Sequence, residues 1–216
     1  MKGGLDEVGM GSLAGPVVVA VTVFKVGEDG CPIEGVRDSK KLTRTKREAL
    51  TPLIMEEAVY VGVGWAGPKL IDEKGISEAW QFAAKQALAR IPNRTTLIVD
   101  GVVAPTHLPA EWVGTVETVK KADATCWFVS AASIVAKAIR DRDMMDMATR
   151  FPAYGWAKNV GYPTPAHYAQ LKTAGPSPYH RITFLKNMIK RGELVLQGLG
   201  GTNPGGPKCY GVNNSF

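Results

Sequence analysis

Residues 15–24 have the sequence GPVVVAVTVF, an apolar run rich in β-branched side chains that opens with Gly-Pro. A run of this length and composition predicts a long strand buried on both faces. Working outward, the alternating segment at residues 58–65 and the short apolar segment at residues 96–99 predict two more strands. Residues 1–5 and 116–119 predict two short ones.

Helical spacing of apolar residues marks the segments between and after these strands. The predicted helices cover residues 43–55, 77–89, 130–147, 165–173 and 183–190. Strands dominate the first half of the chain and helices the second half. This order predicts an α/β sheet with a helical C-terminal part.

Composition excludes several classes of protein. The chain has 216 residues, of which 45% are hydrophobic and 21% charged, as in ordinary globular proteins. No apolar run reaches the roughly 18 residues that a membrane helix needs. Cys31, Cys126 and Cys209 are too few and too scattered for a disulfide framework or a zinc site. We therefore expect reduced thiols in a cytoplasmic protein without a membrane segment.

The charge balance favours a polyanionic partner without proving one. The sequence contains 26 Lys and Arg against 20 Asp and Glu, a net charge of +6. Six cations lie in residues 37–47 (RDSKKLTRTKR). This run is either a solvated helix start or a phosphate-binding segment, in which Ser39 and Lys40 precede the helix.

Two adjacent acids, Asp6 and Glu7, lie between the first predicted strand and a glycine-rich turn. Neighbouring side chains in a regular strand point to opposite faces, so joint action of the two acids needs a bend. Gly9 and Gly11 supply local backbone freedom for one. A solvated surface pair is the alternative interpretation.

Two further acids occupy positions where sites are often assembled. Asp100 ends the apolar strand at residues 96–99, and strand ends are the usual place for sites in open α/β sheets. Asp123 comes shortly before the long predicted helix. Turn formation by Asp100 and helix capping by Asp123 are the alternatives.

The acids come without a matching set of Cys or His residues. Carboxylate oxygens are hard ligands, and without Cys or His partners they favour Mg²⁺ or Mn²⁺ over zinc. A pair of these ions can clamp a phosphodiester and generate the attacking hydroxide.

A last cluster of polar and aromatic residues follows the long helix. Tyr162 lies in a Gly-Tyr-Pro-Thr turn, His167 follows it, and His180 precedes Arg181. An aromatic side chain in a turn can stack on a sugar or a base, although a single Tyr also packs in many cores. The His180–Arg181 pair fits a structural hydrogen-bonding corner equally well.

Together, these segments resemble the ribonuclease HII family. The resemblance runs from Asp6 to about Phe184 and keeps the family's order. Its segments are Asp6 to Pro16 (DEVGMGSLAGP), Asp38 to Leu42 (DSKKL), Ile71-Asp72, Gly75-Ile76, Val99-Asp100-Gly101, Lys121-Ala122-Asp123, Ser130 to Lys137 (SAASIVAK), Arg140-Asp141-Arg142, Gly161 to Thr164 with His167, and His180-Arg181 with Phe184.

The resemblance implies a ribonuclease H-like fold, a mixed five-stranded sheet flanked by helices with a helical C-terminal part. It implies endonucleolytic hydrolysis of RNA in RNA–DNA hybrids that depends on Mg²⁺ or Mn²⁺ and leaves a 3′-hydroxyl and a 5′-phosphate. It also implies cutting on the 5′ side of a single ribonucleotide in duplex DNA.

Family roles carry over residue by residue. Four residues fall on the family's catalytic and metal-binding acids: Asp6, Glu7, Asp100 and Asp123. Six fall on substrate-binding positions: Gly9, Met10 and Gly11 in the turn that contacts the ribose 2′-hydroxyl, Tyr162 at the ribonucleotide junction, and Ser39 and Lys40 near the phosphates. Met10 departs from the family, because bacterial members usually carry Arg there.

Alternatives stay open, and Met10 bears on the one in which the enzyme is restricted to longer hybrids. The chain is predicted to be a two-metal endonuclease, or an enzyme restricted to longer hybrids, or a non-catalytic hybrid binder. A DNA nuclease of the same architecture is a further alternative, although it would have no reason to carry the Gly9–Gly11 turn with Tyr162.

The predicted organisation is a catalytic domain at residues 1–184, a C-terminal helix at 185–197 and a flexible Gly/Pro-rich tail at 198–216. We expect a monomer whose partner is an RNA–DNA hybrid or a DNA duplex containing ribonucleotides. The tail shows no clear sliding-clamp motif.

Overall fold

The structure is a computed structural model that describes residues 1–25, 30–37 and 39–194. The predicted tail at residues 198–216 lies outside the described residues, as does Asp38.

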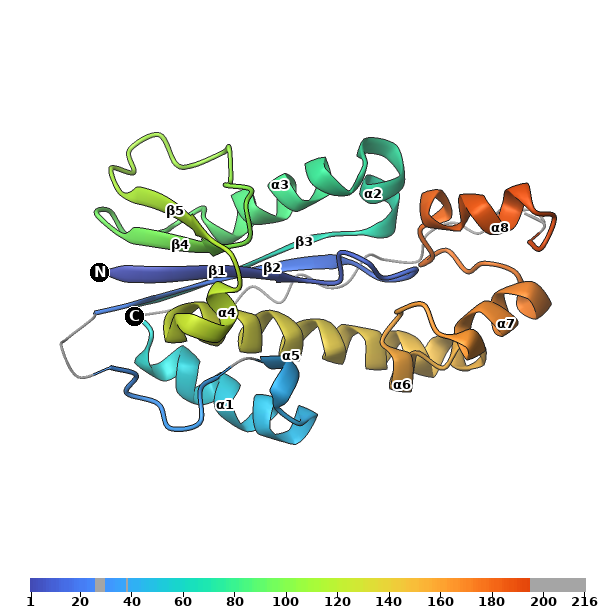
Figure 1. Cartoon of the computed structure of the whole chain (residues 1–216), viewed down its shortest axis with the longest axis horizontal. Helices are drawn as coiled ribbons and strands as arrows, with labels where there is room; N and C mark the ends of the chain where they lie inside the picture. Colours follow the sequence, from blue (N-terminus) through green and yellow to red (C-terminus); the bar gives the residue numbers. More distant parts are fainter. Residues whose placement is uncertain (26–29, 38, 195–216) are drawn as a thin grey trace.

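One mixed sheet forms the centre of the molecule (Figure 1). Its strands are β1 (Lys2–Val8), β2 (Val17–Phe24), β3 (Tyr60–Ala66), β4 (Thr96–Asp100) and β5 (Thr115–Val119). Their order across the sheet is β3-β2-β1-β4-β5. β2 pairs antiparallel with β1 and β3, whereas β1–β4 and β4–β5 are parallel pairs.

Helices cover both faces of this sheet (Figure 1). They are α1 (Arg44–Glu57), α2 (Pro68–Lys74), α3 (Ile76–Ala87), α4 (Ala122–Thr125), α5 (Trp127–Arg150), α6 (Trp156–Asn159), α7 (Pro165–Ala174) and α8 (Lys186–Lys190). Short 3₁₀ turns occupy Ser39–Lys41, Pro152–Tyr154 and Ile182–Leu185.

Strand β2 is buried along its whole length, as its apolar sequence predicts. Val17, Val19, Val21 and Val23 belong to the core under α3, and three side chains on the other face belong to the core under α1 and α5: Val18, Ala20 and Phe24. Burying a valine side chain contributes roughly 1.5–3 kcal/mol, so this strand anchors both layers.

The long helix α5 crosses β1 at very short range. A Cβ at Gly4 would lie 2.4 Å from the backbone of Phe128, so only glycine fits there. The Thr22 hydroxyl also donates to the Phe128 carbonyl at 2.8 Å. This close approach brings the N-terminal half of α5 next to the acids of β1.

Several boundaries differ from the sequence prediction. β1 continues to Val8, so both of its acids lie inside the strand. The helix α2 was not predicted, because it is only one short segment between Gly67 and Gly75. α5 begins before Ser130, at Trp127, and the described chain after the 3₁₀ turn is helical only to Lys190.

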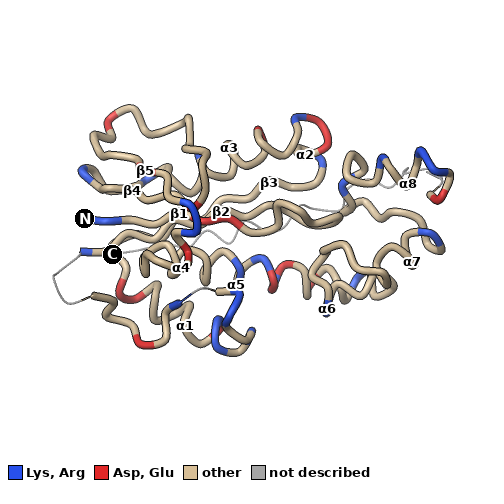
Figure 2. Tube along the Cα trace, in the orientation of Figure 1, with Lys and Arg blue, Asp and Glu red and all other residues tan. Residues whose placement is uncertain are grey.

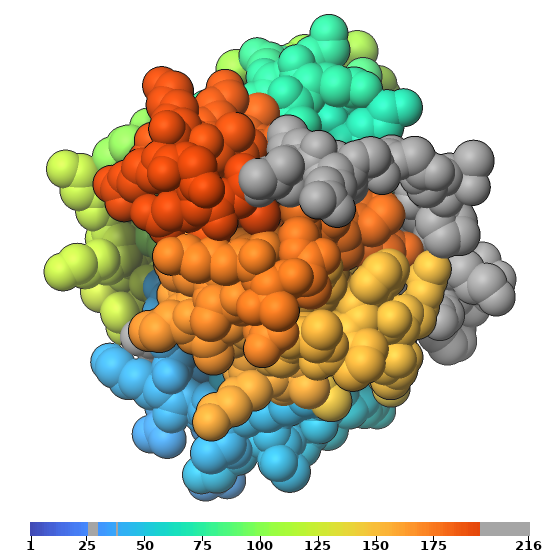
Figure 3. Space-filling model, turned by 90° about the vertical axis from the view of Figure 1, so that its right-hand side faces the viewer, coloured from blue at the N-terminus to red at the C-terminus, as the bar shows by residue number. Residues whose placement is uncertain are grey.

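The C-terminal segments build one end of the molecule, beyond the ends of the central strands β1 and β2 (Figures 1 and 3). They enclose a separate aromatic core around Trp156, with Tyr154, Leu171 and Tyr179. Thr164 caps α7 by accepting the His167 amide, and Pro165 follows at the first helical position. Within the described ranges, no helix is long and apolar enough to cross a membrane.

Candidate active site

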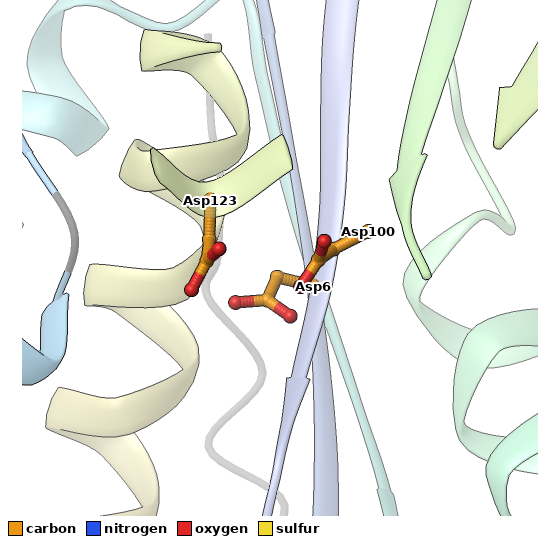
Figure 4. Close-up of side chains that lie close together, drawn as sticks. All are labelled: Asp6, Asp100 and Asp123. Atoms are coloured by element: carbon orange, nitrogen blue, oxygen red, sulfur yellow. The ribbon is translucent and has the colours of Figure 1, made fainter. Parts of the chain in front are cut away.

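Three aspartates from separate elements converge beside the sheet. Asp6 lies on β1, Asp100 ends β4, and Asp123 lies in the first turn of α4. Each offers a carboxylate oxygen within 4.8 Å of the other two. Figure 4 shows the three side chains pointing toward one another. Asp6 and Asp123 are buried.

The turn between β5 and α4 fixes the positions of Asp100 and Asp123. Lys121 has a left-handed backbone (φ 60°) and directs the Ala122 amide toward Asp100, which accepts it at 2.7 Å. The Ser130 hydroxyl donates to the Asp123 carbonyl at 2.7 Å. Asp100 thus holds the start of α4, and Lys121, not Asp123, is the N-cap residue.

Glu7 lies outside this triad. β1 stays paired with β2 through Val8, so the predicted bend between Asp6 and Glu7 is absent. Because neighbouring strand residues face opposite ways, Asp6 faces α5 and Glu7 faces α3. There the Trp80 indole N–H donates to the Glu7 carboxylate at 3.3 Å.

Burial and neighbouring carboxylates raise the pKa values of two of the acids, Asp6 and Glu7. Burial, followed by the charge of Glu7, raises the pKa of Asp6 to about 7. Burial and the charge of Asp100 also raise the pKa of Glu7, although the Trp80 hydrogen bond opposes this. Lys40 lies 3.1 Å from the Asp123 carboxylate and offsets part of the charge. Clustered hard oxygen donors with this excess negative charge fit a divalent cation such as Mg²⁺ or Mn²⁺.

A groove of about 400 Å³ opens beside Glu7, at the end of β1. It brings together all of the predicted substrate-binding residues with Glu7. Its lining consists of Glu7, Val8, Gly9, Met10, Gly11, Ser39, Lys40, Ser133, Lys137 and Tyr162. Figure 2 shows basic positions close to the acidic positions of β1 and α4, including the lysines that precede α4.

The glycine turn and Tyr162 meet directly in this groove. The Gly9 amide donates to the Tyr162 hydroxyl at 3.2 Å. Gly9 has φ +92°, and a Cβ there would lie 2.3 Å from the Arg140 guanidinium, so glycine is required. The Met10 carbonyl accepts from Arg181 at 3.1 Å, and the Met10 side chain packs against the core under α3.

Ser39 and Lys40 have different surroundings although they are adjacent. Ser39 is buried, with its hydroxyl 2.7 Å from that of Ser133, whereas the Lys40 side chain is 74% exposed. Sequence reasoning did not select Ser133 and Lys137 as site residues. Their spacing of four residues, which places them on one face of α5, was the available signal.

Fold and site together define a phosphodiester hydrolase of ribonuclease H-like architecture, with acids gathered beside the strands of a mixed sheet. The family model described as ribonuclease HII matches residues 3–187. "Ribonuclease HII" of Paracoccus denitrificans (strain Pd 1222) is 44% identical over 182 residues, covering 84% of this chain and 83% of the relative. "Ribonuclease HII" of Lactobacillus delbrueckii subsp. bulgaricus is 46% identical over 185 residues, covering 85% and 69%.

Two solved structures are similar along most of their length. Ribonuclease H2 of Pyrococcus horikoshii OT3 aligns with a TM-score of 0.70 and 32% identity, covering 88% of this chain and 97% of that one. RNase HII of Archaeoglobus fulgidus, solved in complex with PCNA, aligns with a TM-score of 0.66 and 27% identity, covering 94% and 98%.

The chain belongs to the ribonuclease HII family. It is a ribonuclease H, an endonuclease that hydrolyses RNA in RNA–DNA hybrids. The prediction of a ribonuclease H-like mixed five-stranded sheet is confirmed.

Proposed function

We propose that this ribonuclease H also cuts on the 5′ side of a single ribonucleotide in duplex DNA, as ribonucleotide excision requires. Cleavage would use two metal ions and leave a 3′-hydroxyl and a 5′-phosphate. The observation that carries this proposal is one groove lined by Glu7, the Gly9–Gly11 turn and Tyr162, next to the strand position of Asp6. We expect the protein to act as a cytoplasmic monomer, with residues 1–184 as its catalytic domain.

The acids would hold the ions. Asp6, Asp100 and Asp123 form one ligand set. Glu7 points to the other side of β1, but, in addition to burial, the charge of the nearby Asp100 raises the pKa of Glu7, and Glu7 would serve the second ion. Bound Mg²⁺ or Mn²⁺ supplies Lewis-acid activation of the phosphate and lowers the pKa of a water nucleophile. Asp6, with its raised pKa, would give up its proton when an ion binds. Lys40 would keep Asp123 oriented through their ion pair.

The glycine turn and Tyr162 would read the sugar. The 2′-hydroxyl distinguishes RNA from DNA, and the backbone of the turn at Gly9, Met10 and Gly11 can bind it without a side chain. Within this turn the Gly9 amide is engaged by the Tyr162 hydroxyl, which leaves the amides of Met10 and Gly11 for the sugar. Tyr162 lines the same groove, and its ring would stack on the nucleotide at the junction. Replacement of the usual Arg by Met10 removes a cation but leaves these amides in place.

The phosphate backbone would lie along the cationic residues of the groove. Exposed Lys40 is suited to contact a phosphate. The Ser39 hydroxyl, 2.7 Å from the Ser133 hydroxyl, would hold the Lys40 turn against α5.

The test is cleavage of three end-labelled duplexes with Mg²⁺, with Mn²⁺ and with EDTA. One contains a single ribonucleotide, one is a full RNA–DNA hybrid, and one is all DNA. We expect metal-dependent nicking 5′ to the single ribonucleotide. Cleavage of the hybrid alone would support the second candidate, an enzyme restricted to long hybrids, which the loss of the cation at Met10 favours.

Matched variants test which residues recognise the ribose of the single ribonucleotide. Tyr162→Ala should reduce cleavage at a single ribonucleotide far more than cleavage of the long hybrid, whereas Tyr162→Phe separates the ring from the hydroxyl. Met10→Arg tests whether the missing cation limits junction cleavage. If Tyr162→Ala loses equal activity on both substrates, Tyr162 has no role in recognising the single ribonucleotide. Cleavage of the all-DNA duplex by the wild-type chain would indicate a DNA nuclease. Tight binding of the hybrid without cleavage would indicate a non-catalytic binder.

A further inference from the structure

We propose that His167 is a positioning residue for Tyr162, and that Trp156 and His180 hold His167 in the tautomer that this role requires. The inference rests on the proposed role of Tyr162 in substrate recognition. It assigns a use to a buried imidazole pair that lies outside the acid triad.

The geometry links the two histidines to Tyr162 in a chain. His167 lies in the first turn of α7, fully buried, and its Nδ1 is 3.0 Å from the Tyr162 carbonyl oxygen. Its Nε2 is 3.2 Å from the Trp156 indole nitrogen and 3.0 Å from His180 Nε2. The His167 backbone is fixed as well, because its amide donates to the Thr164 hydroxyl.

The partners determine where the protons reside. An indole N–H only donates, so His167 Nε2 must accept from Trp156. The Ser177 amide donates to His180 Nδ1 at 2.9 Å, which leaves the His180 proton on Nε2, directed at His167. His167 therefore carries its proton on Nδ1 and donates it to the Tyr162 carbonyl.

Both rings are neutral at ordinary pH. Burial lowers the pKa of His167, and burial together with the nearby His167 lowers the pKa of His180 to about 3. A neutral pair is required by the hydrogen-bond chain, because His167 Nε2 can accept only while it is unprotonated.

The segment that carries Tyr162 needs external support. Val160, a β-branched residue, has φ 42°, and Gly161 has φ 84°. A left-handed β-branched residue persists only where surrounding contacts hold it. Here Arg140 binds the Val160 carbonyl at 2.9 Å and lies over the Tyr162 ring, 5.4 Å from its centroid.

Tyr162 is consequently held at four places, one of which is local, because its amide donates to the Asn159 carbonyl at 2.9 Å. Its hydroxyl accepts from Gly9, its ring faces Arg140, and its carbonyl accepts from His167. Of these, the His167 contact connects the substrate groove to the aromatic core around Trp156. Loss of that contact would leave the Tyr162 carbonyl unsupported and let the residue shift while the fold persists. A shift of about 1 Å in a group that recognises substrate costs up to about 100-fold.

Two substitutions separate positioning from mere packing. His167→Asn places an amide nitrogen near the position of Nδ1, so it can still donate to Tyr162 while it loses the contact with Trp156 and His180. His167→Gln extends an amide to the position of Nε2, so it keeps an acceptor for Trp156 but loses the donor to Tyr162. Both variants should lower Tm.

We expect His167→Gln to lower the ratio of single-ribonucleotide to long-hybrid cleavage by about 10- to 100-fold. His167→Asn should keep this ratio within about 2-fold of wild type at a comparable Tm. Equal ratios in the two variants would overturn the proposal. Tyr162→Ala, measured in parallel, tests the proposed function separately. If it leaves the ratio unchanged, Tyr162 does not recognise the substrate, but the hydrogen bond by which His167 holds Tyr162 is not refuted.

Two spectroscopic measurements that do not depend on enzymatic activity complete the test. Long-range ¹⁵N–¹H correlation spectra of the wild-type chain should show the Nδ1–H tautomer for His167 and the Nε2–H tautomer for His180. The Gly9 amide should exchange its hydrogen faster in His167→Gln than in His167→Asn, because Tyr162 no longer holds it. An Nε2–H tautomer for His167, or Gly9 exchange that is equal in both variants, would overturn the inference whatever the cleavage ratios show.

Discussion

The acid triad and the imidazole cluster are two buried polar groups with opposite electrostatic characters. Asp6, Asp100 and Asp123 bring like charges within 4.8 Å, and the pKa of Asp6 rises to about 7. His167 and His180 instead form a neutral chain in which each ring nitrogen has a hydrogen-bonding partner. A satisfied polar cluster fixes structure, whereas a charged cluster with excess negative charge is suited to bind a cation.

The two regions meet at Tyr162. One end of this residue contacts Gly9, close to the end of the acid-bearing strand, and its carbonyl contacts His167. Substitutions in one region, with the other region as the reference, test whether the two clusters differ in function as they do in charge.

The largest effect is expected from Asp100→Asn. Loss of one carboxylate from the triad should reduce metal-dependent cleavage of the hybrid by about 10³-fold or more, because metal activation contributes several kcal/mol. Duplex binding should remain, since Asp100 is not a cationic contact. Initial rates and a binding titration at constant salt measure both quantities. Turnover near the wild-type rate would show that the acid site is misassigned.

Metal addition should raise the Tm of the protein, and this rise should depend on the acid triad and not on the imidazole cluster. An ion that binds the native state at 100 times its Kd adds about 2.7 kcal/mol, which corresponds to a rise in Tm of about 5–10 °C for a chain of this size. Thermal unfolding with EDTA and with saturating Mg²⁺ should show this rise in the wild type and in His167→Asn. Asp100→Asn should lose most of it, and an equal rise in all three would place the ion elsewhere.

The pH dependence of stability should have opposite signs in the two regions. The folded pKa of Asp6 is raised to about 7 from 3.8, so its protonated form favours folding and its contribution is lost as pH rises between those values. The folded pKa of His180 is lowered to about 3 from 6.5, so its contribution is present above pH 6.5 and lost as pH falls toward 3.

Urea unfolding in EDTA can separate these signs. Relative to wild type, Asp6→Asn should gain stability as pH rises from 5 to 8, on the order of 2 kcal/mol. The stability deficit of His180→Asn should instead be largest above pH 6.5 and shrink in acid. Parallel pH profiles for both variants would contradict the charge assignment of the two clusters.

The smallest effect is expected at the left-handed turn beside the triad. Lys121 has φ 60°, which costs an L-residue roughly 1–2 kcal/mol, whereas glycine pays about 0.5–1 kcal/mol in entropy. Lys121→Gly should therefore raise the free energy of unfolding by about 0.5–1 kcal/mol. Lys120→Gly is the matched control in the same turn and should lower it, so a loss of stability in both variants would exclude backbone strain at Lys121.

Much of the fold and of the acid site could be predicted from the sequence. The run at residues 17–24 has the composition of a strand buried on both faces, and β2 is such a strand. Hard oxygen side chains at Asp6, Asp100 and Asp123 indicated a cation site, and these three residues converge. Local periodicity and residue chemistry carry this information because neighbours along the chain determine it.

Other features depended on contacts between distant segments. The opposite facing of Asp6 and Glu7 follows from unbroken pairing of β1 with β2, which the glycines after Glu7 do not interrupt. The burial of Ser39 follows from its contact with Ser133 on α5. Neither arrangement has a periodic signal in the local sequence.

The sequence by itself determined the element types, the acids and the turn residues, because backbone propensity and side-chain chemistry are local properties. Tertiary structure alone decided that His167 meets His180 and Trp156 and supports Tyr162. The close packing of α5 on Gly4 is likewise a tertiary contact, and it brings Ser133 beside Asp6. Such contacts arise where packing selects one arrangement of whole elements, and side-chain identity at any one position does not specify that arrangement.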